Sequence, residues 1–383
     1  MRFRGGKPLV YGDPFITGGS TAVFSFDLAS FGTFTRSTEA SYQTSASSIA
    51  WAAANTIRIE DRGDGSGGMI LLEGSSKNWL TYSETFGTTW AGGGTRTGGA
   101  VLGPDGTTYV DRLNMASGDA GWYQYYSSYT GPSTHTSWVR AVSGTAFARR
   151  CNVTYGLVQL SGCVVEATVG TSWQRVGFTY SEAGGGTYAM VADARSWSTY
   201  GGTGASASDC YWASSQVERM PFCTSAIRTT SATVTRGADI LSGSMSSVPS
   251  KITSDAYSID VAPIFSSADG IAYANDQCIF SFAEDDSERL FFVVSGGSIY
   301  LRVVSGGSTK VTSGALSFSA NQKLTIAVNS ASGSVTVSGA TSGNGTSTGT
   351  PWGRTLGPTF YVGNRQGATQ PSYVRIGRYV SAS

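Results

Sequence analysis

The chain has 383 residues, of which only 13% are charged, and its formal net charge at pH 7 is +1. So small a net charge gives no long-range attraction to nucleic acid or to an acidic membrane, and no apolar run reaches the roughly 18 residues that a spanning helix needs. Glycine is abundant, with 51 residues, and aromatic residues make up 12%. This composition predicts an all-β chain of short strands and many tight turns, long enough for two domains.

Residues 1–75 are expected to form a small N-terminal attachment arm or base. The opening "MRFRGGKPLVYGDPF" contains basic side chains, but glycine and proline interrupt any apolar stretch, so we expect no secretory signal. Short strands such as "GGMILLEGSS" follow, in a segment too small and glycine-rich to bury a large core alone. Arg2, Arg4 and Lys7 are candidates for attachment to an acidic surface of a larger assembly, with a solvated chain end as the alternative.

Residues 76–238 are expected to form a jelly-roll-like antiparallel sandwich. Segments such as "HTSWVRAVS", "SWQRVGFTYSEA" and "DCYWASSQVERM" read as successive strands joined by glycine-rich turns. Val176 and Phe178 fall on one strand face, whereas Trp173 and Arg175 fall on the other. Residues 239–250 then read as a linker, because they are rich in serine and glycine and poor in apolar side chains.

Residues 251–383 are expected to form a second antiparallel sandwich. The stretch "FFVVSGGSIYLRVVSGGSTKV" predicts two consecutive hairpins with Ser-Gly-Gly at both bends. Ile299, Leu301 and Val303 alternate with polar residues, which predicts one buried strand face.

The five cysteines have no CxxC spacing, so the sequence predicts neither a metal site nor a cofactor. Cys151 and Cys163 flank "NVTYGLVQLSG" and could face each other across a hairpin. Either a disulfide or a pair of buried free thiols fits this spacing, and we favour the free thiols.

Two phrases in the middle of the chain carry a family resemblance. The stretch "LLEGSSKNWLTYSETFGTTW", followed by "GPDGTTYVDRL", resembles the start of a carbohydrate-binding-module-like domain common in structural proteins of tailed bacteriophages. The later strands "TSWVR", "TSWQRVGFTY" and "DCYWASSQVE" match the order of that family, and "FGTFTRSTEASYQT" resembles a phrase that often precedes it. The C-terminal stretches "KLTIAVNSASGSVTVSG" and "FYVGNRQG" resemble a concanavalin-like or laminin-G-like sandwich.

The resemblance implies a structural protein on the surface of a phage particle, assembled in the cytoplasm of a bacterial host. Head fibre, tail fibre and capsid decoration protein all remain open, since all three use such domains. The implied partners are further copies of the chain, as a homotrimer or another symmetric oligomer, other capsid or tail proteins, and glycans on the host surface or in its environment. A nucleic acid or membrane partner is not implied.

Catalytic chemistry is not expected, and we assign no catalytic residue. His135 is the single histidine, and a histidine needs defined partners to serve in a triad or a metal site. The acidic stretches "IEDRGD" and "AEDDSERL" fall where strands should turn, so solvated loop charges explain them better than a glycosidase carboxylate pair.

The aromatic segments suggest where a sugar could bind, because flat rings stack on the apolar faces of sugars. In "GWYQYYSSY", alternate residues project to opposite faces of a strand, so one set can stay exposed, while core packing explains the same pattern. The candidate carbohydrate-binding residues are Trp122, Tyr123, Tyr125, Tyr126, Arg195, Trp197 and Tyr200. A second candidate patch comprises Trp352, Arg354 and Arg365.

The leading hypothesis is therefore a non-enzymatic phage virion protein that binds glycans. Two alternatives remain open: a sugar-binding module of a bacterial surface or secreted protein, and a capsid decoration protein that only stabilises its neighbours. In the glycan-binding case, many copies on one particle would raise the avidity of a weak single site.

Overall fold

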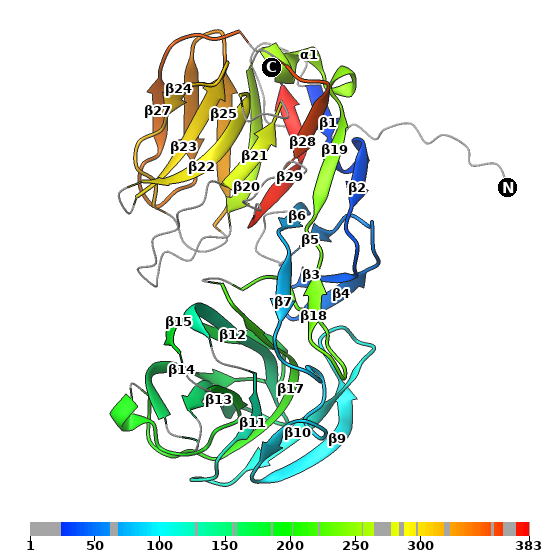
Figure 1. Cartoon of the computed structure of the whole chain (residues 1–383), viewed down its shortest axis with the longest axis vertical. Coiled ribbons are helices and arrows are strands. Elements are labelled where there is room, and N and C mark those ends of the chain that lie inside the picture. Colours follow the sequence, from blue (N-terminus) through cyan, green and yellow to red (C-terminus); the bar gives the residue numbers. More distant parts are fainter. Residues whose placement is uncertain are drawn as a thin grey trace, which may run out of the picture.

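The structure is a computed structural model that describes residues 24–61, 68–126, 129–154, 157, 159–184, 187–200, 202–220, 223–254, 256–263, 277–282, 287–295, 298–317, 322–353, 356–362 and 373–382. The all-β prediction is confirmed: strands dominate, every described strand pair is antiparallel, and the one described α-helix, α1 (Ser250–Ser254), has five residues. Two β-sandwiches lie at opposite ends of the long axis (Figure 1). No helix among these residues is long and apolar enough to span a membrane.

The lower sandwich in Figure 1 consists of two five-stranded sheets, and we call it the inserted sandwich. Its tyrosine sheet has the order β14-β13-β16-β11-β8, and its covered sheet has the order β15-β12-β17-β10-β9. Leu113, Val139 and Trp212 from the covered sheet pack against Ala148 and Val191 from the tyrosine sheet in one core. The strands are β8 (Ala91–Gly92), β9 (Thr95–Leu102), β10 (Tyr109–Met115), β11 (Trp122–Tyr125), β12 (Thr130–Ala141), β13 (Ala146–Thr154), β14 (Gln159–Val169), β15 (Gln174–Ala183), β16 (Thr187–Val191) and β17 (Ser208–Glu218).

The upper sandwich combines strands from both ends of the described chain, and we call it the terminal sandwich. One sheet has the order β27-β26-β25-β20-β29-β6-β5, with β1 also paired to β29, and the other has the order β2-β19-β28-β21-β22-β23-β24. The strands from the first part of the chain are β1 (Phe24–Asp27), β2 (Thr33–Thr35), β5 (Ile59–Glu60) and β6 (Met69–Glu73). The others are β19 (Ile240–Ser244), β20 (Ala256–Pro263), β21 (Gln277–Ser281), β22 (Arg289–Ser295), β23 (Ser298–Ser305), β24 (Ser308–Thr312), β25 (Leu324–Asn329), β26 (Ser334–Ser338), β27 (Gly345–Thr348), β28 (Thr359–Val362) and β29 (Tyr373–Ala382).

The pairing of the early strands corrects the expected domain boundaries. Within residues 1–75, β6 pairs along β29 and β2 pairs with β19, so β1, β2, β5 and β6 belong to the terminal sandwich and do not form a separate base. Residues 239–250 do not form a linker either, because β19 lies between β2 and β28 in a sheet. The inserted sandwich thus interrupts the terminal one, and the early strands bury their apolar faces against strands far away in sequence.

The two hairpins predicted around residues 291–312 are confirmed. Ser295 pairs with Ser298, and Ser305 pairs with Ser308, so each bend contains two residues. Gly306 and Gly307 both have positive φ, at +58° and +70°, as a tight hairpin turn requires. Leu301 and Val303 are buried in the core of the terminal sandwich.

Two strands that pair side by side connect the two sandwiches. β7 (Ser76–Asn78) follows β6, β18 (Val234–Arg236) precedes β19, and the two pair with each other. Just above this pair, the backbone N–H of Asp239 donates to the carbonyl oxygen of Glu73 at 2.8 Å. The neck between the sandwiches is therefore a two-stranded ribbon whose upper end is held together by a backbone hydrogen bond.

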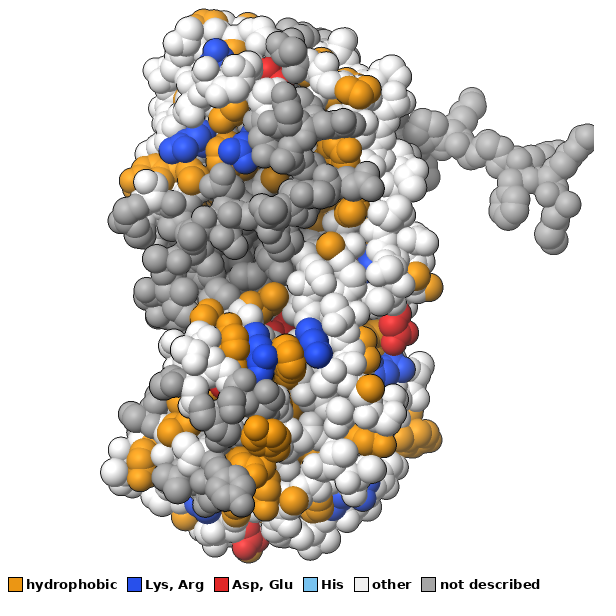
Figure 2. Space-filling view, viewed as in Figure 1, with side chains coloured by type: hydrophobic (Ala, Val, Ile, Leu, Met, Phe, Trp, Pro, Cys, Tyr) orange, Lys and Arg blue, Asp and Glu red, His pale blue; other side chains and the backbone are white. Residues whose placement is uncertain are grey.

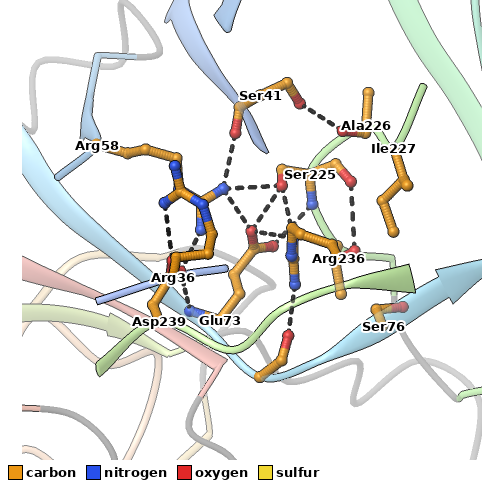
Figure 3. Close-up of polar contacts among 12 residues, drawn as sticks. Arg36, Ser41, Arg58, Glu73, Ser76, Ser225, Ala226, Ile227, Arg236 and Asp239 are labelled. Carbon is orange, nitrogen blue, oxygen red and sulfur yellow. Dashed lines mark hydrogen bonds and ion pairs between the residues drawn. The ribbon is translucent and has the colours of Figure 1, made fainter. Parts of the chain in front are cut away.

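A buried cluster of three arginines and two carboxylates lies at this neck (Figure 3). Arg58 contacts Glu73 at 2.7 Å and also pairs with Asp239, whereas Arg36 contacts Asp239 at 3.0 Å and Arg236 contacts Glu73 at 2.5 Å. All five side chains are at most 1% exposed. Burial alone raises the pKa of Glu73, but the charges of Arg236 and Arg58 outweigh it and lower this pKa to about 2.

The neck cluster also reaches backbone groups of neighbouring elements. Arg58 donates to the carbonyl oxygen of Ser41 at 2.7 Å and to the hydroxyl of Ser225 at 2.8 Å, while Arg36 donates to the carbonyl oxygen of Ala53 at 2.8 Å. Ser41 belongs to the hairpin of β3 (Ala40–Ser45) and β4 (Ser48–Ala52). The cluster thus ties this hairpin to β6 through Glu73 and to β18 through Arg236.

The β3–β4 hairpin packs on the outer face of the covered sheet. Ile49 and Trp51 of the hairpin share a hydrophobic cluster with Trp138, Trp173 and Val110 of the inserted sandwich. The indole N–H of Trp51 donates to Asp105 at 3.1 Å, in the turn before β10. One outer face of the inserted sandwich is therefore occupied by a segment of the chain itself.

Candidate ligand-binding face

The outer face of the tyrosine sheet carries three tyrosines from two neighbouring strands. Tyr123 and Tyr125 alternate with Gln124 on β11, and Tyr125 pairs directly with Tyr188 on β16. The Tyr188 ring lies 5.5 Å from the Tyr123 ring at 90° and 5.5 Å from the Tyr125 ring at 62°. Tyr125 is 52% exposed, and the other two rings are partly buried. Such edge-to-face contacts hold the rings in fixed orientations while leaving ring surface accessible.

Trp122 and Tyr126, the other aromatic residues predicted for this strand, face the opposite way. Trp122 packs against the sandwich core, and Tyr126 is only 4% exposed. The hydroxyl of Tyr126 donates to the buried carboxylate of Glu182 at 2.8 Å. Because strand side chains alternate, these two residues belong to the core and do not reach the tyrosine face.

Trp197 is also buried, although its neighbours frame the tyrosine face. Its ring is 0% exposed and packs in a cluster with Cys151, Val153 and Met190 on the outer side of the same sheet. The indole N–H donates to Asp193 at 2.8 Å. Trp197 therefore anchors a loop and does not offer a ring face to a ligand.

Arg195 and Tyr200 lie on that same loop, with Tyr200 at the end of the 3-10 helix η2 (Ser198–Tyr200). Arg195 donates to both carboxylate oxygens of Asp193 at 2.9 Å and to the carbonyl oxygen of Leu157 at 2.8 Å. The partly buried Tyr200 ring stands edge to face with Trp197, with centroids 6.1 Å apart. Both residues therefore lie on the tyrosine-sheet side, next to Trp197, and their role in carbohydrate binding stays a prediction.

The charges beside the tyrosine face are paired. Burial lowers the pKa of Arg195, but its hydrogen bonds and the charge of Asp193 outweigh this effect and raise the pKa above its ordinary value. Arg149 on β13 is fully buried and donates to Glu166 at 2.7 Å. Arg149 thus pairs with Glu166, and Arg195 pairs with Asp193. Figure 2 shows that charged side chains are sparse over the visible surface of the molecule.

Tyr188 was missed by the sequence analysis. The segment "GTYAMVADARSW" was expected to be a strand, but the alignment of Tyr188 opposite Tyr125 depends on a pairing between strands about sixty residues apart, which no local pattern reveals. Asp193, which fixes both Arg195 and Trp197, was also missed.

The other predicted site residues do not form a second patch in the described structure. Trp352 is 8% exposed and belongs to the core of the terminal sandwich. Arg354 and Arg365 lie outside the described residues, as do Arg2, Arg4 and Lys7. Trp352, the aromatic residue of the second candidate patch, is therefore not exposed. Virion attachment by the basic N-terminus stays a prediction.

His135 lies in the interior between the two sheets of the inserted sandwich. It is 0% exposed, stacks on Phe178 with ring centroids 4.9 Å apart, and approaches Ser133 at 3.1 Å. Burial, and then the charge of Arg150, lower the pKa of His135 well below its ordinary value. A neutral histidine enclosed in this way is a packing residue.

The cysteines are free, as we favoured. Cys151 pairs with Val164, so its neighbour Cys163 projects to the opposite face of β14. Burial, and then the charge of Asp193, raise the pKa of Cys151, which makes this thiol unreactive. Across the residues for which the structure gives positions, no group of three or more His, Cys, Asp or Glu side chains could hold a metal ion.

Comparisons with known proteins give little beyond this geometry. The chain matches no protein-family model and no curated protein. Among solved structures, it is similar to the N-terminal CBM22-1-CBM22-2 tandem domain from Paenibacillus barcinonensis Xyn10C, with 11% sequence identity and a TM-score of 0.26, over 80% of this chain and 97% of that one. We therefore take the function from the residues of the site.

Proposed function

We propose that this chain is a non-enzymatic carbohydrate-binding protein and that its ligand lies on the tyrosine face. The observation that carries this proposal is the gathering of Tyr123, Tyr125 and Tyr188 on one side of two adjacent strands. The opposite outer face of the same sandwich is covered by the β3–β4 hairpin. An exposed aromatic surface is a typical mark of an interaction site.

Tyrosine rings suit this task on physical grounds. Their flat faces pack against the C–H groups of a sugar, and their hydroxyls can donate and accept hydrogen bonds. Tyrosine also loses little side-chain entropy on binding, since it has only two rotatable side-chain angles. The contacts of Tyr188 with both neighbours restrict the rings further before any ligand arrives.

We further propose that the protein is a structural component of a tailed-phage particle, exposed at its surface as a head fibre, tail fibre or decoration protein. The low charge content and the phage-like phrases in the sequence support this role. Assembly as a trimer or another symmetric oligomer would multiply a weak single site. Quantitative mass spectrometry of purified particles tests it: hundreds of copies indicate capsid decoration or head fibres, a few dozen or fewer indicate tail fibres, and absence contradicts the virion role.

We favour a glycan-binding role over pure decoration, because Tyr123, Tyr125 and Tyr188 form one aromatic surface on which a sugar ring can stack. A sugar-binding module of a bacterial surface or secreted protein would use the same face. Absence from particles together with glycan binding would favour that alternative.

A glycan array tests the binding proposal. We expect the unmodified chain to bind at least one class of glycan, and the Tyr123→Ala/Tyr125→Ala double variant to lose that binding. Tyr109→Ala is the matched control, because Tyr109 is a 62% exposed tyrosine on β10 of the other sheet. Equal loss in the control, or no binding by the unmodified chain, would contradict the proposal.

A further inference from the structure

The open part of the tyrosine face is short because a loop covers the outer surface of β13 and part of β16. The sheet runs β14-β13-β16-β11-β8, and the three tyrosines lie on β11 and β16. Over β13 and the neighbouring part of β16, Trp197 packs on Cys151, Val153 and Met190. Because Trp197 is itself completely buried, the loop rises above the sheet by at least the thickness of an indole ring.

This loop is fixed in place by a buried arginine. Arg149 projects from β13 and donates to the carbonyl oxygens of Asp193, Arg195 and Gly204 and to the hydroxyl of Thr203. These contacts join the two ends of the loop to each other and to the sheet beneath. The loop is therefore a rigid wall at the β13–β14 side of the tyrosine face.

The opposite side of the face is open. β8 is the neighbour of β11, and Ala91 pairs with Tyr123, so both side chains project to the outer face. Ala91 and Gly92 are both exposed, and neither has a side chain large enough to stop a ligand. The three strands β16, β11 and β8 span about 10 Å between the outer two, which leaves room for only a few sugar rings.

The wall offers no unpaired charge to a ligand. The guanidinium of Arg195 donates to Asp193 and to the carbonyl oxygen of Leu157. The guanidinium of Arg149 donates to Glu166 and to the loop backbone. Asp193 is fully buried, so its negative charge is screened from the face by its own partners. An acidic sugar would find no free cation here, and its carboxylate would lose water without compensation.

We propose that the tyrosine face takes the uncharged end of a glycan chain, with its terminal sugar against the loop of residues 193–204 and the rest leaving over β8. This proposal rests on the proposed carbohydrate-binding function and deepens it. For a glycan that crosses the strands, the wall closes one side, so the site would recognise chain ends or short branches and exclude the interior of a continuous polymer.

The test uses neutral linear oligosaccharides of glucose, galactose, mannose and N-acetylglucosamine, from one to six sugars long. Each is immobilised either through its reducing end or through its non-reducing end, beside matched chains ending in uronic acids. We expect binding in one orientation only, an affinity that stops rising at about three sugars, little change with added salt, and weaker binding of the uronic acid chains. Equal binding in both orientations, an affinity that rises steadily to six sugars, or stronger binding of the acidic chains would overturn the proposal.

A pair of variants tests whether the glycan chain leaves over β8, and neither variant alters the loop that forms the wall. Ala91→Arg places a long side chain on the open side, and we expect it to weaken binding of the trisaccharides by about tenfold, comparable to one lost ring contact. Ala331→Arg makes the same substitution at an exposed turn of the terminal sandwich and should leave binding unchanged. Unchanged binding by Ala91→Arg would overturn the chain-end geometry, whereas no binding of any glycan by the unmodified chain would overturn the carbohydrate function itself.

Discussion

The two outer faces of the inserted sandwich both carry aromatic residues, yet only one is open. On the covered sheet, Trp138 and Trp173 are buried beneath Ile49 and the partly buried Trp51 of the β3–β4 hairpin. On the tyrosine sheet, Tyr125 remains 52% exposed. The residue class alone does not decide which face binds a ligand. What decides it is the placement of a hairpin that enters from the first part of the chain and is held by the neck cluster.

The largest expected effect comes from breaking the neck cluster that holds the hairpin. Arg58→Met leaves Glu73 and Asp239 with one fewer cation in a buried site, and we expect the free energy of unfolding to fall by about 3–5 kcal/mol in urea denaturation. Arg112→Met is the matched control, since the Arg112–Asp209 pair is more than one-third exposed on both sides and should contribute less than about 1 kcal/mol. Equal effects of the two variants would contradict the role given to the cluster.

A core substitution on the covered face should show that its aromatic residues are structural. Trp138 is 2% exposed, and Trp138→Ala should lower the free energy of unfolding by about 3–5 kcal/mol through the cavity that it leaves. Tyr125→Ala on the other face should change stability by less than about 0.5 kcal/mol. Thermal and urea unfolding measure both, and a large loss for Tyr125→Ala would show that its ring is a packing residue instead.

The pH dependence of stability probes the interior between the two sheets. Burial keeps His135 neutral when folded, whereas in the unfolded chain it takes up a proton with a pKa of about 6.5. The unfolded state then binds more protons below that pH, so stability is fully present above pH 6.5 and falls as the pH drops, at up to about 1.4 kcal/mol per pH unit from this group. His135→Gln should flatten this part of the curve, and an unchanged slope would contradict the assignment.

The smallest expected free-energy change concerns Tyr188 on the open face. Tyr188→Ala removes a ring that contacts both Tyr123 and Tyr125, and we expect the affinity for a bound oligosaccharide to fall by up to about tenfold with little loss of stability. Isothermal titration calorimetry measures this change, and Tyr109→Ala again serves as the control. An unchanged affinity would remove Tyr188 from the site.

Local alternation made much of this structure predictable. The period of two in "WQRVGFTY" put Val176 and Trp173 on opposite strand faces, and the structure places Val176 in the core and Trp173 on the outer face. The same rule separated Tyr123 and Tyr125 from Trp122 and Tyr126, although it could not say which pair faces solvent. Short-range patterns also identified the hairpins of the second sandwich, because glycine pairs at bends carry their own conformational signal.

The insertion of one sandwich into the other could not be predicted in the same way. Nothing near Met69–Glu73 indicates that this strand pairs with Tyr373–Ala382, about three hundred residues away. The buried Arg36, Arg58 and Arg236 look like ordinary surface residues in sequence, since only the fold brings Glu73 and Asp239 to them. Trp197 was predicted as a sugar-binding residue because it is aromatic, but hydrogen bonds to Asp193 and from Arg149 hold its loop on the sheet and bury the ring.

A crystal structure of the full chain soaked with a neutral oligosaccharide tests the central claim most directly. The account predicts a sugar ring packed against Tyr123, Tyr125 and Tyr188, with the chain end against the loop that contains Trp197 and the remainder over Ala91. A sugar bound elsewhere, with the tyrosine face empty, would contradict the claim that this face is the ligand site.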